Sequence, residues 1–135
     1  MPLPLELNAR DKEKAVSHAI TALINDRRVI TGKGYRHLEE TAFMRKKKQI
    51  YFRNDLGIPD TVFLKCGFKP APEGRRVDYE DSGVIVFSTR DIRGQPTGNI
   101  QFAYGFGHLG GHGYEMRVHK SILMRYFSYV HQWTS

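Results

Sequence analysis

The sequence predicts an α+β fold in a single domain that covers residues 1–135. Apolar residues between Ala9 and Ile24 recur at three- and four-residue spacing, as they do on one face of a helix. Gly83–Ser88 is an almost continuous apolar run, which is typical of a central strand. The segment Lys120–Trp133 repeats the helical spacing. We therefore expect two N-terminal helices, a mostly antiparallel sheet of about five strands, and a C-terminal helix packed on that sheet with Trp133 buried.

The two helices are predicted in the N-terminal part of the chain. Asn8 precedes the first apolar stripe and belongs to the residue types that cap helices. Turn residues in the stretch Asn25–Gly34 end this first helix. A second helix is expected to begin near Gly34. It should end within Arg45–Lys48, because four consecutive cations surround a full helical turn and one of them would face the core.

The remaining elements are predicted as strands and loops. Aromatic and β-branched residues favour strands at Lys48–Arg53 and Val62–Phe68. Prolines and a glycine make Lys69–Gly83 a long loop. Ile100–Tyr104 and Tyr114–Val118 are expected to pair as neighbouring strands. The later strands have no crossover helix between them, and this favours an antiparallel sheet.

The positive charge of the chain is concentrated in one stretch, Arg27–Arg53, which we call the basic segment. It holds nine Lys or Arg and two acidic residues, so its net charge is 9 − 2 = +7, the net charge of the whole chain. Such a focused positive field attracts polyanions and accelerates their capture. The candidate binding residues are Arg27, Arg28, Lys33, Arg36, Arg45, Lys46, Lys47, Lys48 and Arg53.

Four aromatic residues accompany these cations: Tyr35, Phe43, Tyr51 and Phe52. Cations neutralise phosphates and ring faces stack on unpaired bases, so the first hypothesis is a protein that binds nucleic acid, with RNA or single strands favoured. A solvated basic face over core aromatics explains the pattern equally well. A third hypothesis is an assembly or inhibitor protein whose basic face binds an acidic protein partner.

The segment Tyr104–Tyr114 is the second distinctive feature, because it has five glycines in nine residues and two histidines. Glycine permits positive φ and close approach of the backbone to a ligand. A hairpin turn with exposed histidines is the favoured interpretation. The alternative is a small metal-independent endoribonuclease in which His108, His112 and Tyr114 supply acid–base chemistry. That hypothesis gains support if the segment lies beside the basic segment. A metal site would need further ligands, and His37 and His131 have no predicted partner.

The other features narrow the class of protein. Cys66 is the only cysteine, so it forms no intrachain disulfide; we expect a buried thiol and a reducing compartment. The sequence has no secretory signal and no apolar stretch long enough to span a bilayer, which predicts a cytoplasmic protein without a membrane partner. No catalytic or cofactor motif is present, and no cofactor is expected.

Overall fold

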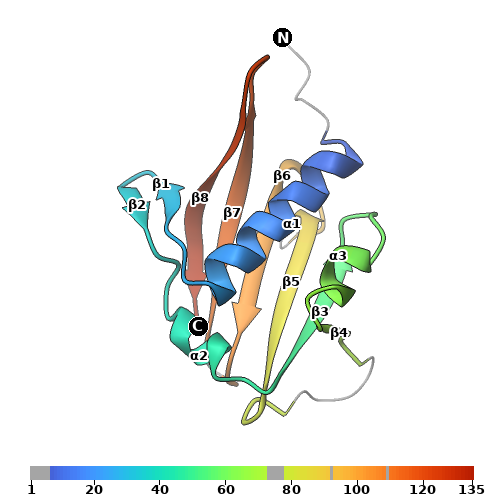
Figure 1. Ribbon diagram of the computed structural model, residues 1–135, viewed down its shortest axis with the longest axis vertical. Helices are drawn as coiled ribbons and strands as arrows, with labels where there is room; N and C mark the ends of the chain where they lie inside the picture. Colours follow the sequence, from blue (N-terminus) through green and yellow to red (C-terminus); the bar gives the residue numbers. More distant parts are fainter. Residues whose placement is uncertain (1–6, 73–77, 92, 109) are drawn as a thin grey trace.

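A computed structural model describes residues 7–72, 78–91, 93–108 and 110–135 of the chain. All eight strands of this part belong to one sheet, in the order β2-β1-β8-β7-β6-β5-β3-β4 (Figure 1). The helices are α1 (Ala9–Ile24), α2 (Thr41–Arg45) and α3 (Thr61–Leu64); the strands are β1 (Val29–Thr31), β2 (Gly34–Arg36), β3 (Gln49–Asp55), β4 (Lys69–Pro70), β5 (Ser82–Arg90), β6 (Pro96–Gly105), β7 (Gly111–Lys120) and β8 (Arg125–Thr134).

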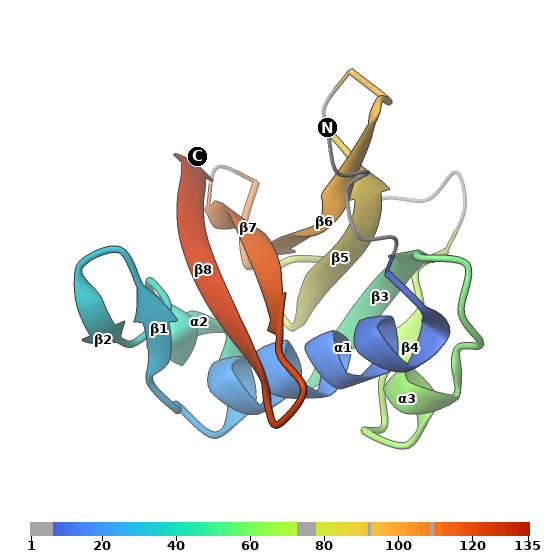
Figure 2. The same ribbon diagram turned by 90° about the horizontal axis from the view of Figure 1, so that it is seen from above.

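The sheet is mixed rather than antiparallel. Its centre, β5 to β8, is antiparallel, whereas β1 joins β8 in parallel and β3 joins both β5 and β4 in parallel. The sheet is strongly curved, and α1 crosses it on one face (Figure 2). The strands therefore present one face to α1 and the opposite face to the outside.

Helix α1 follows the sequence prediction, including its cap. The Asn8 side chain accepts a hydrogen bond from the Asp11 N–H at 2.8 Å, and the Asp11 carboxylate accepts one from the Asn8 N–H at 3.2 Å. This reciprocal pair satisfies two N–H groups that the first turn leaves without partners. The side chains packed on the sheet are the apolar stripe of the sequence: Ala15, Val16, Ala19, Ile20 and Leu23.

The core lies between the helices and the inner face of the sheet. Phe63 of α3 is fully buried and stacks on Phe52 of β3, with the ring centroids 4.4 Å apart. Phe87 of β5 stacks on Phe102 of β6 at 4.8 Å. Phe63 also meets Phe87 edge-on at 5.6 Å, so these rings join α3 to β3, β5 and β6.

The predicted C-terminal helix is wrong, because Lys120–Trp133 contains a turn and strand β8. Phe127 and Tyr129 are buried and their neighbours are not, which is the two-residue period of a strand. Ile122, expected in the core, is fully exposed at the tip of the β7–β8 hairpin. Trp133, expected to be buried, is 47% exposed. The spacing of the apolar residues in this segment fits both a helix and a strand. Hydrogen-bonded pairing with β7 makes the segment a strand.

Three further expectations are corrected. The second helix near Gly34 is a β1–β2 hairpin followed by the five-residue α2. The strand predicted at Val62–Phe68 contains α3, because a short apolar run does not distinguish a strand from a helix. The expected five-stranded sheet has eight strands and parallel pairs, since α3 and β4 provide a crossover between β3 and β5.

The predicted strands at Lys48–Arg53 and Gly83–Ser88 are confirmed as β3 and β5, and the pairing around the glycine-rich segment is confirmed as β6–β7. In the part of the chain that the structure describes, no helix is long and apolar enough to cross a membrane.

Candidate nucleic-acid interface and acid–base site

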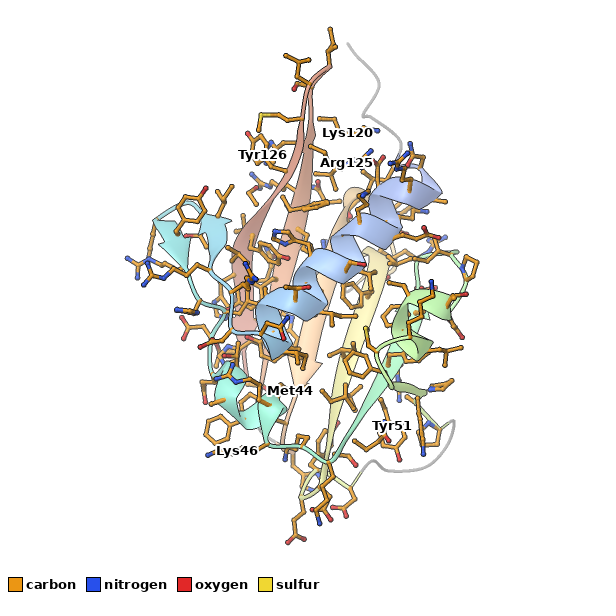
Figure 3. All side chains as sticks on the ribbon, viewed as in Figure 1. Met44, Lys46, Tyr51, Lys120, Arg125 and Tyr126 are labelled. Atoms are coloured by element: carbon orange, nitrogen blue, oxygen red, sulfur yellow. The ribbon has the colours of Figure 1, made fainter. Side chains whose placement is uncertain are left out.

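The basic segment runs from the end of α1 through the β1–β2 hairpin and α2 into β3. Eight of its nine cations are exposed, and the ninth, Lys47, is half-buried. The Lys47 ammonium group donates to the carbonyl oxygen of Tyr79. Lys46 lies at the outer side of α2 and points away from the core (Figure 3). The predicted charge is therefore available to a ligand at the surface.

Two of the four aromatic residues in the basic segment are accessible as ring platforms. Tyr35 is 69% exposed and Phe43 is 49% exposed. The Phe43 ring stacks on Phe106 of the glycine-rich segment, with centroids 4.8 Å apart and planes 13° apart. Phe52 belongs to the core, and Tyr51 is half-buried.

The glycine-rich segment contacts the basic segment directly. Nε2 of His112 lies 3.0 Å from Oε1 of Glu40, the residue that precedes α2. Only 3% of His112 is exposed, and its ring lies 6.2 Å from that of Phe106. His112, one of the predicted acid–base residues, is therefore hydrogen-bonded to the segment that carries the net charge.

His112 also contacts two side chains of strand β8, His131 and Thr134. Nδ1 of His112 lies 3.2 Å from Nε2 of His131 on β8. The Thr134 hydroxyl lies 3.1 Å from each of these two nitrogens. His131 is exposed, whereas both nitrogens of His112 are occupied. We call Glu40, His112 and His131 the histidine relay; its two ends, Glu40 and His131, are exposed, and His112 between them is buried.

The backbone at Glu40 is strained, and two buried tyrosines hold it. Glu40 has φ 52°, in the left-handed region that costs a side-chain-bearing residue on the order of 1–3 kcal/mol. The Tyr104 hydroxyl donates to the carbonyl of the preceding residue, Glu39, and the Glu39 N–H donates to the Tyr114 hydroxyl at 2.8 Å. Burial raises the pKa of both tyrosines, so both remain protonated. Tyr114, predicted as a catalytic residue, thus holds the peptide that positions Glu40.

A second carboxylate–imidazole pair lies beside the relay. Nδ1 of His37 is 3.2 Å from Oδ1 of Asp26. The Thr41 hydroxyl also donates to this oxygen, at 3.1 Å, and Arg45 lies 3.3 Å from it. Partial burial favours the neutral acid, but the Thr41 bond and the charges of Arg45 and His37 lower the pKa of Asp26. Its carboxylate is therefore ionised at neutral pH.

Thr41 connects the two pairs, and their two acidic residues share an unusual backbone conformation. Thr41, which bonds Asp26, follows Glu40 directly in the chain. Asp26, at φ 53°, and Glu40 are also the two residues other than glycine with positive φ among those described. The sequence did not predict the roles of Glu40, His131 and Asp26. Their contacts join residues far apart in the chain, and an acidic residue with a left-handed backbone has no sequence motif.

His108 and most of the glycines have other roles. His108 is exposed and its ring meets that of Tyr79 edge-on at 5.4 Å, outside the relay. The five glycines of the segment have no positive φ. Gly113 instead leaves room for the indole of Trp133, and a Cβ at Gly111 would lie 2.8 Å from the Tyr104 carbonyl oxygen. A Cβ at Gly110 would lie 2.6 Å from the Phe106 ring, so close packing explains three of the five glycines.

Two remaining expectations concern cysteine and metals. Cys66 is exposed rather than buried. Among the described residues, no three His, Cys, Asp or Glu side chains converge as a metal-binding group.

Comparison with known proteins gives no further guide: no family model, curated protein or solved structure matches this chain.

Proposed function

We propose that the protein binds single-stranded RNA through the basic segment and cleaves it by metal-independent acid–base chemistry. The observation that carries this proposal is the bond between Glu40 of the basic segment and His112 of the glycine-rich hairpin. It brings titratable imidazoles to the surface that would hold the phosphates.

Binding would combine charge and stacking. The exposed cations neutralise phosphates without regard to sequence. Tyr35 and the stacked pair Phe43–Phe106 offer ring faces on which bases can stack. A base must leave its own helix to stack on a protein ring, so single strands are favoured over duplexes.

Cleavage would use two imidazoles. The 2′-hydroxyl oxygen attacks the adjacent phosphorus while the bond from phosphorus to the 5′-oxygen breaks. His131 accepts the 2′-hydroxyl proton, and His37 donates a proton to the departing 5′-oxygen. Glu40, through His112, and Asp26 orient these imidazoles and place negative charge behind them. The products are a 2′,3′-cyclic phosphate and a 5′-hydroxyl.

The cleavage step is tested with labelled RNA and its all-deoxy analogue in EDTA. We expect RNA to be cut and the deoxy analogue, which has no 2′-hydroxyl, to be bound but left intact. His131→Ala and His37→Ala should each lower the cleavage rate on the order of a hundredfold or more. His108→Ala, which changes an exposed histidine outside the relay, is the control and should cut like the parent. If the protein retains RNA but never cuts it, the cleavage step is refuted and only the binding proposal remains.

The binding step is tested by charge removal. Changing Lys33, Arg36 and Lys46 together to alanine should weaken RNA binding and flatten its salt dependence, by about 0.7 in the log–log slope for each lost phosphate contact. The matched control removes three exposed cations outside the basic segment, Arg10, Lys14 and Lys65. Equal losses in the two triple variants would mean that binding follows net charge and not the basic segment.

One observation favours a protein partner as a second candidate function. Three consecutive apolar residues at the β7–β8 tip are exposed, Ile122 at 101%, Leu123 at 94% and Met124 at 63%. An assembly or inhibitor protein would use such a tip as an anchor. Substituting serine for Ile122 and Leu123 should leave RNA binding unchanged if RNA is the ligand. If the parent protein retains no RNA at low salt, the protein-partner candidate replaces the first.

A further inference from the structure

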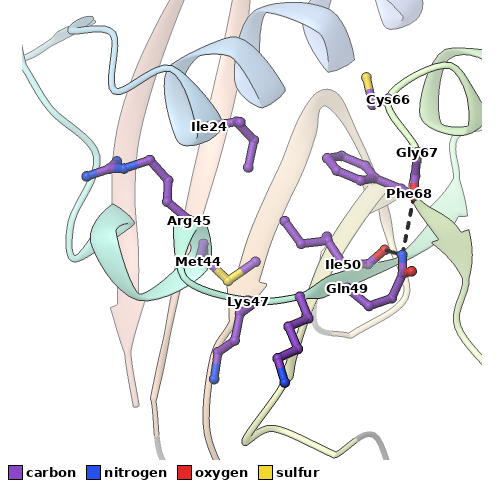
Figure 4. A pocket seen from close by; sticks show the side chains of 10 residues that line it. Ile24, Met44, Arg45, Lys47, Gln49, Ile50, Cys66, Gly67 and Phe68 are labelled. Carbon is purple, nitrogen blue, oxygen red and sulfur yellow. Dashed lines mark hydrogen bonds between the residues drawn. The ribbon is translucent and has the colours of Figure 1, made fainter.

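A pocket of about 400 Å³ opens between the C-terminal end of α1, the α2–β3 connection and the turn after α3 (Figure 4). This volume lies within the range of small-molecule sites, roughly 300–1,000 Å³. Its wall contains neither His112 nor His131 of the relay, yet it includes three cations of the basic segment. The lining residues are Ile24, Met44, Arg45, Lys47, Lys48, Gln49, Ile50, Cys66, Gly67 and Phe68.

The wall combines apolar and cationic surface. Ile24 and Phe68, which are half-buried, supply the accessible apolar part of the wall, whereas Met44 and Ile50 are buried. Three of the ten lining residues are cations, and none is acidic. A ligand that matches this wall has a flat or apolar part next to a negative group.

The three cations differ in how far existing contacts occupy them. Arg45 binds Asp26, and Lys47 donates to the Tyr79 carbonyl. Lys48 lies 3.6 Å from Asp81, beyond ordinary hydrogen-bond distance, and its side chain is 81% exposed. Lys48 is therefore the cation most available to an incoming anion.

We propose that this pocket binds one nucleotide, with the base against Phe68 and the phosphate at Lys48. The assignment rests on the proposed function, because the pocket shares Arg45, Lys47 and Lys48 with the basic segment. The side-chain amide of Gln49 favours a base over a plain acyl chain. Gln49 donates through its amide nitrogen to the carbonyls of Ile50 and Gly67, so its own carbonyl oxygen is left to accept from a base amino group.

Cys66 gives a direct readout, because it is the only cysteine and lies in the pocket wall. Partial burial raises the pKa of its thiol, so alkylation is best followed at about pH 8.5 to 9. The alkylation rate is measured with iodoacetamide alone and with CMP, UMP, AMP or GMP at millimolar concentration. We expect at least one mononucleotide to slow alkylation at least fivefold at saturation. Inorganic phosphate and decanoate serve as separate arms, and neither should protect as well.

Variants identify the residues responsible. Lys48→Ala should raise the nucleotide concentration needed for half-protection at least threefold, whereas Lys14→Ala, at an exposed lysine outside the pocket, should not change it. Phe68→Ala should weaken protection further, provided that its far-UV circular dichroism matches the parent. Lys48→Ala, a surface substitution, keeps the test decisive if the Phe68 variant does not fold.

The possible results separate the two proposals. No protection by any mononucleotide, or equal protection by decanoate or phosphate alone, overturns the pocket assignment even if the protein cleaves RNA. Protection that is lost in Lys48→Ala supports the assignment even if no RNA is cut, in which case only the cleavage step fails.

Discussion

Replacing Asp11 with asparagine is expected to lower the free energy of unfolding by about 3 kcal/mol. The Asp11 side chain is fully buried, and its carboxylate lies 3.0 Å from Nζ of Lys120 and 3.0 Å from Nε of Arg125. Both cations reach from the β7–β8 hairpin towards the start of α1 (Figure 3). The carboxylate therefore ties the N-terminal helix to the far end of the sheet.

The magnitude follows from which groups remain after the substitution. Breaking a buried ion pair by removing one partner costs about 3–5 kcal/mol. The Lys120 and Arg125 side chains are 33% and 25% exposed, so water screens the charges left behind and the lower end applies. Asparagine retains an acceptor for the Asn8 N–H, so the helix cap is conserved. A loss of about 3 kcal/mol corresponds to a fall in Tm of roughly 10 °C for a domain of this size.

Urea denaturation followed by far-UV circular dichroism measures this effect. Glu13→Gln, at an exposed acid of the same helix, is the control and should change stability by less than about 0.5 kcal/mol. Burial favours the neutral acid, but the bonds from Lys120 and Asn8 and the charge of Arg125 lower the pKa of Asp11 below 3.8. The contribution is thus complete above pH 3.8 and is lost as the pH falls through the lower, folded-state pKa. An Asp11→Asn variant as stable as the parent at pH 7 would refute this account.

Two further predictions concern His18 and Gly113. Burial lowers the pKa of His18 below 6.5, and Nδ1 of its ring lies 2.8 Å from the Tyr129 hydroxyl. The unfolded state therefore binds the proton more readily, so the free energy of unfolding should fall as the pH drops below about 6.5. In urea denaturation at several pH values, His18→Gln should flatten this dependence of stability on pH. The same dependence in the variant and the parent would contradict the prediction. Gly113→Ala should cost about 1–3 kcal/mol, because its Cβ would overlap the Trp133 indole. Gly107→Ala, where a Cβ would meet only ordinary contacts, is its control, and equal effects would exclude the packing explanation.

The sequence predicted elements correctly where local and tertiary signals agree. Helix α1 has both a cap at Asn8 and an apolar stripe, and β5 is an apolar run long enough to cross the core. At Lys120–Trp133 the apolar residues fit two periods, and only the register with β7 decides between them. Hydrogen bonds to a neighbouring strand join residues far apart in the chain, so a short stretch of sequence does not reveal them.

The candidate site could likewise be predicted only in part. The position of the charge could be predicted, because it depends only on which residues are present. The contact of Glu40 with His112 joins residues 72 positions apart, and it depends on a left-handed backbone at Glu40. Two buried hydroxyls on neighbouring strands hold that backbone, so the whole sheet must be assembled before the relay exists.

Because the backbone at Glu40 is strained, replacing this residue can distinguish a functional role of its side chain from a structural one. A turn at this position needs only a residue that tolerates positive φ, and glycine does so at no steric cost. Glu40→Gly should relieve about 1 kcal/mol of strain and lose about as much with the bond to His112, so the free energy of unfolding should change by less than about 1 kcal/mol. RNA cleavage should nevertheless fall at least tenfold, because His131 loses the negative charge that the Glu40 carboxylate places behind it through His112. Glu40→Gln, which keeps the strain and a hydrogen-bonding amide but not the charge, should lose cleavage to a similar degree. If cleavage declines only in proportion to the folded fraction, the acidic residue at this strained position serves the fold and not the chemistry.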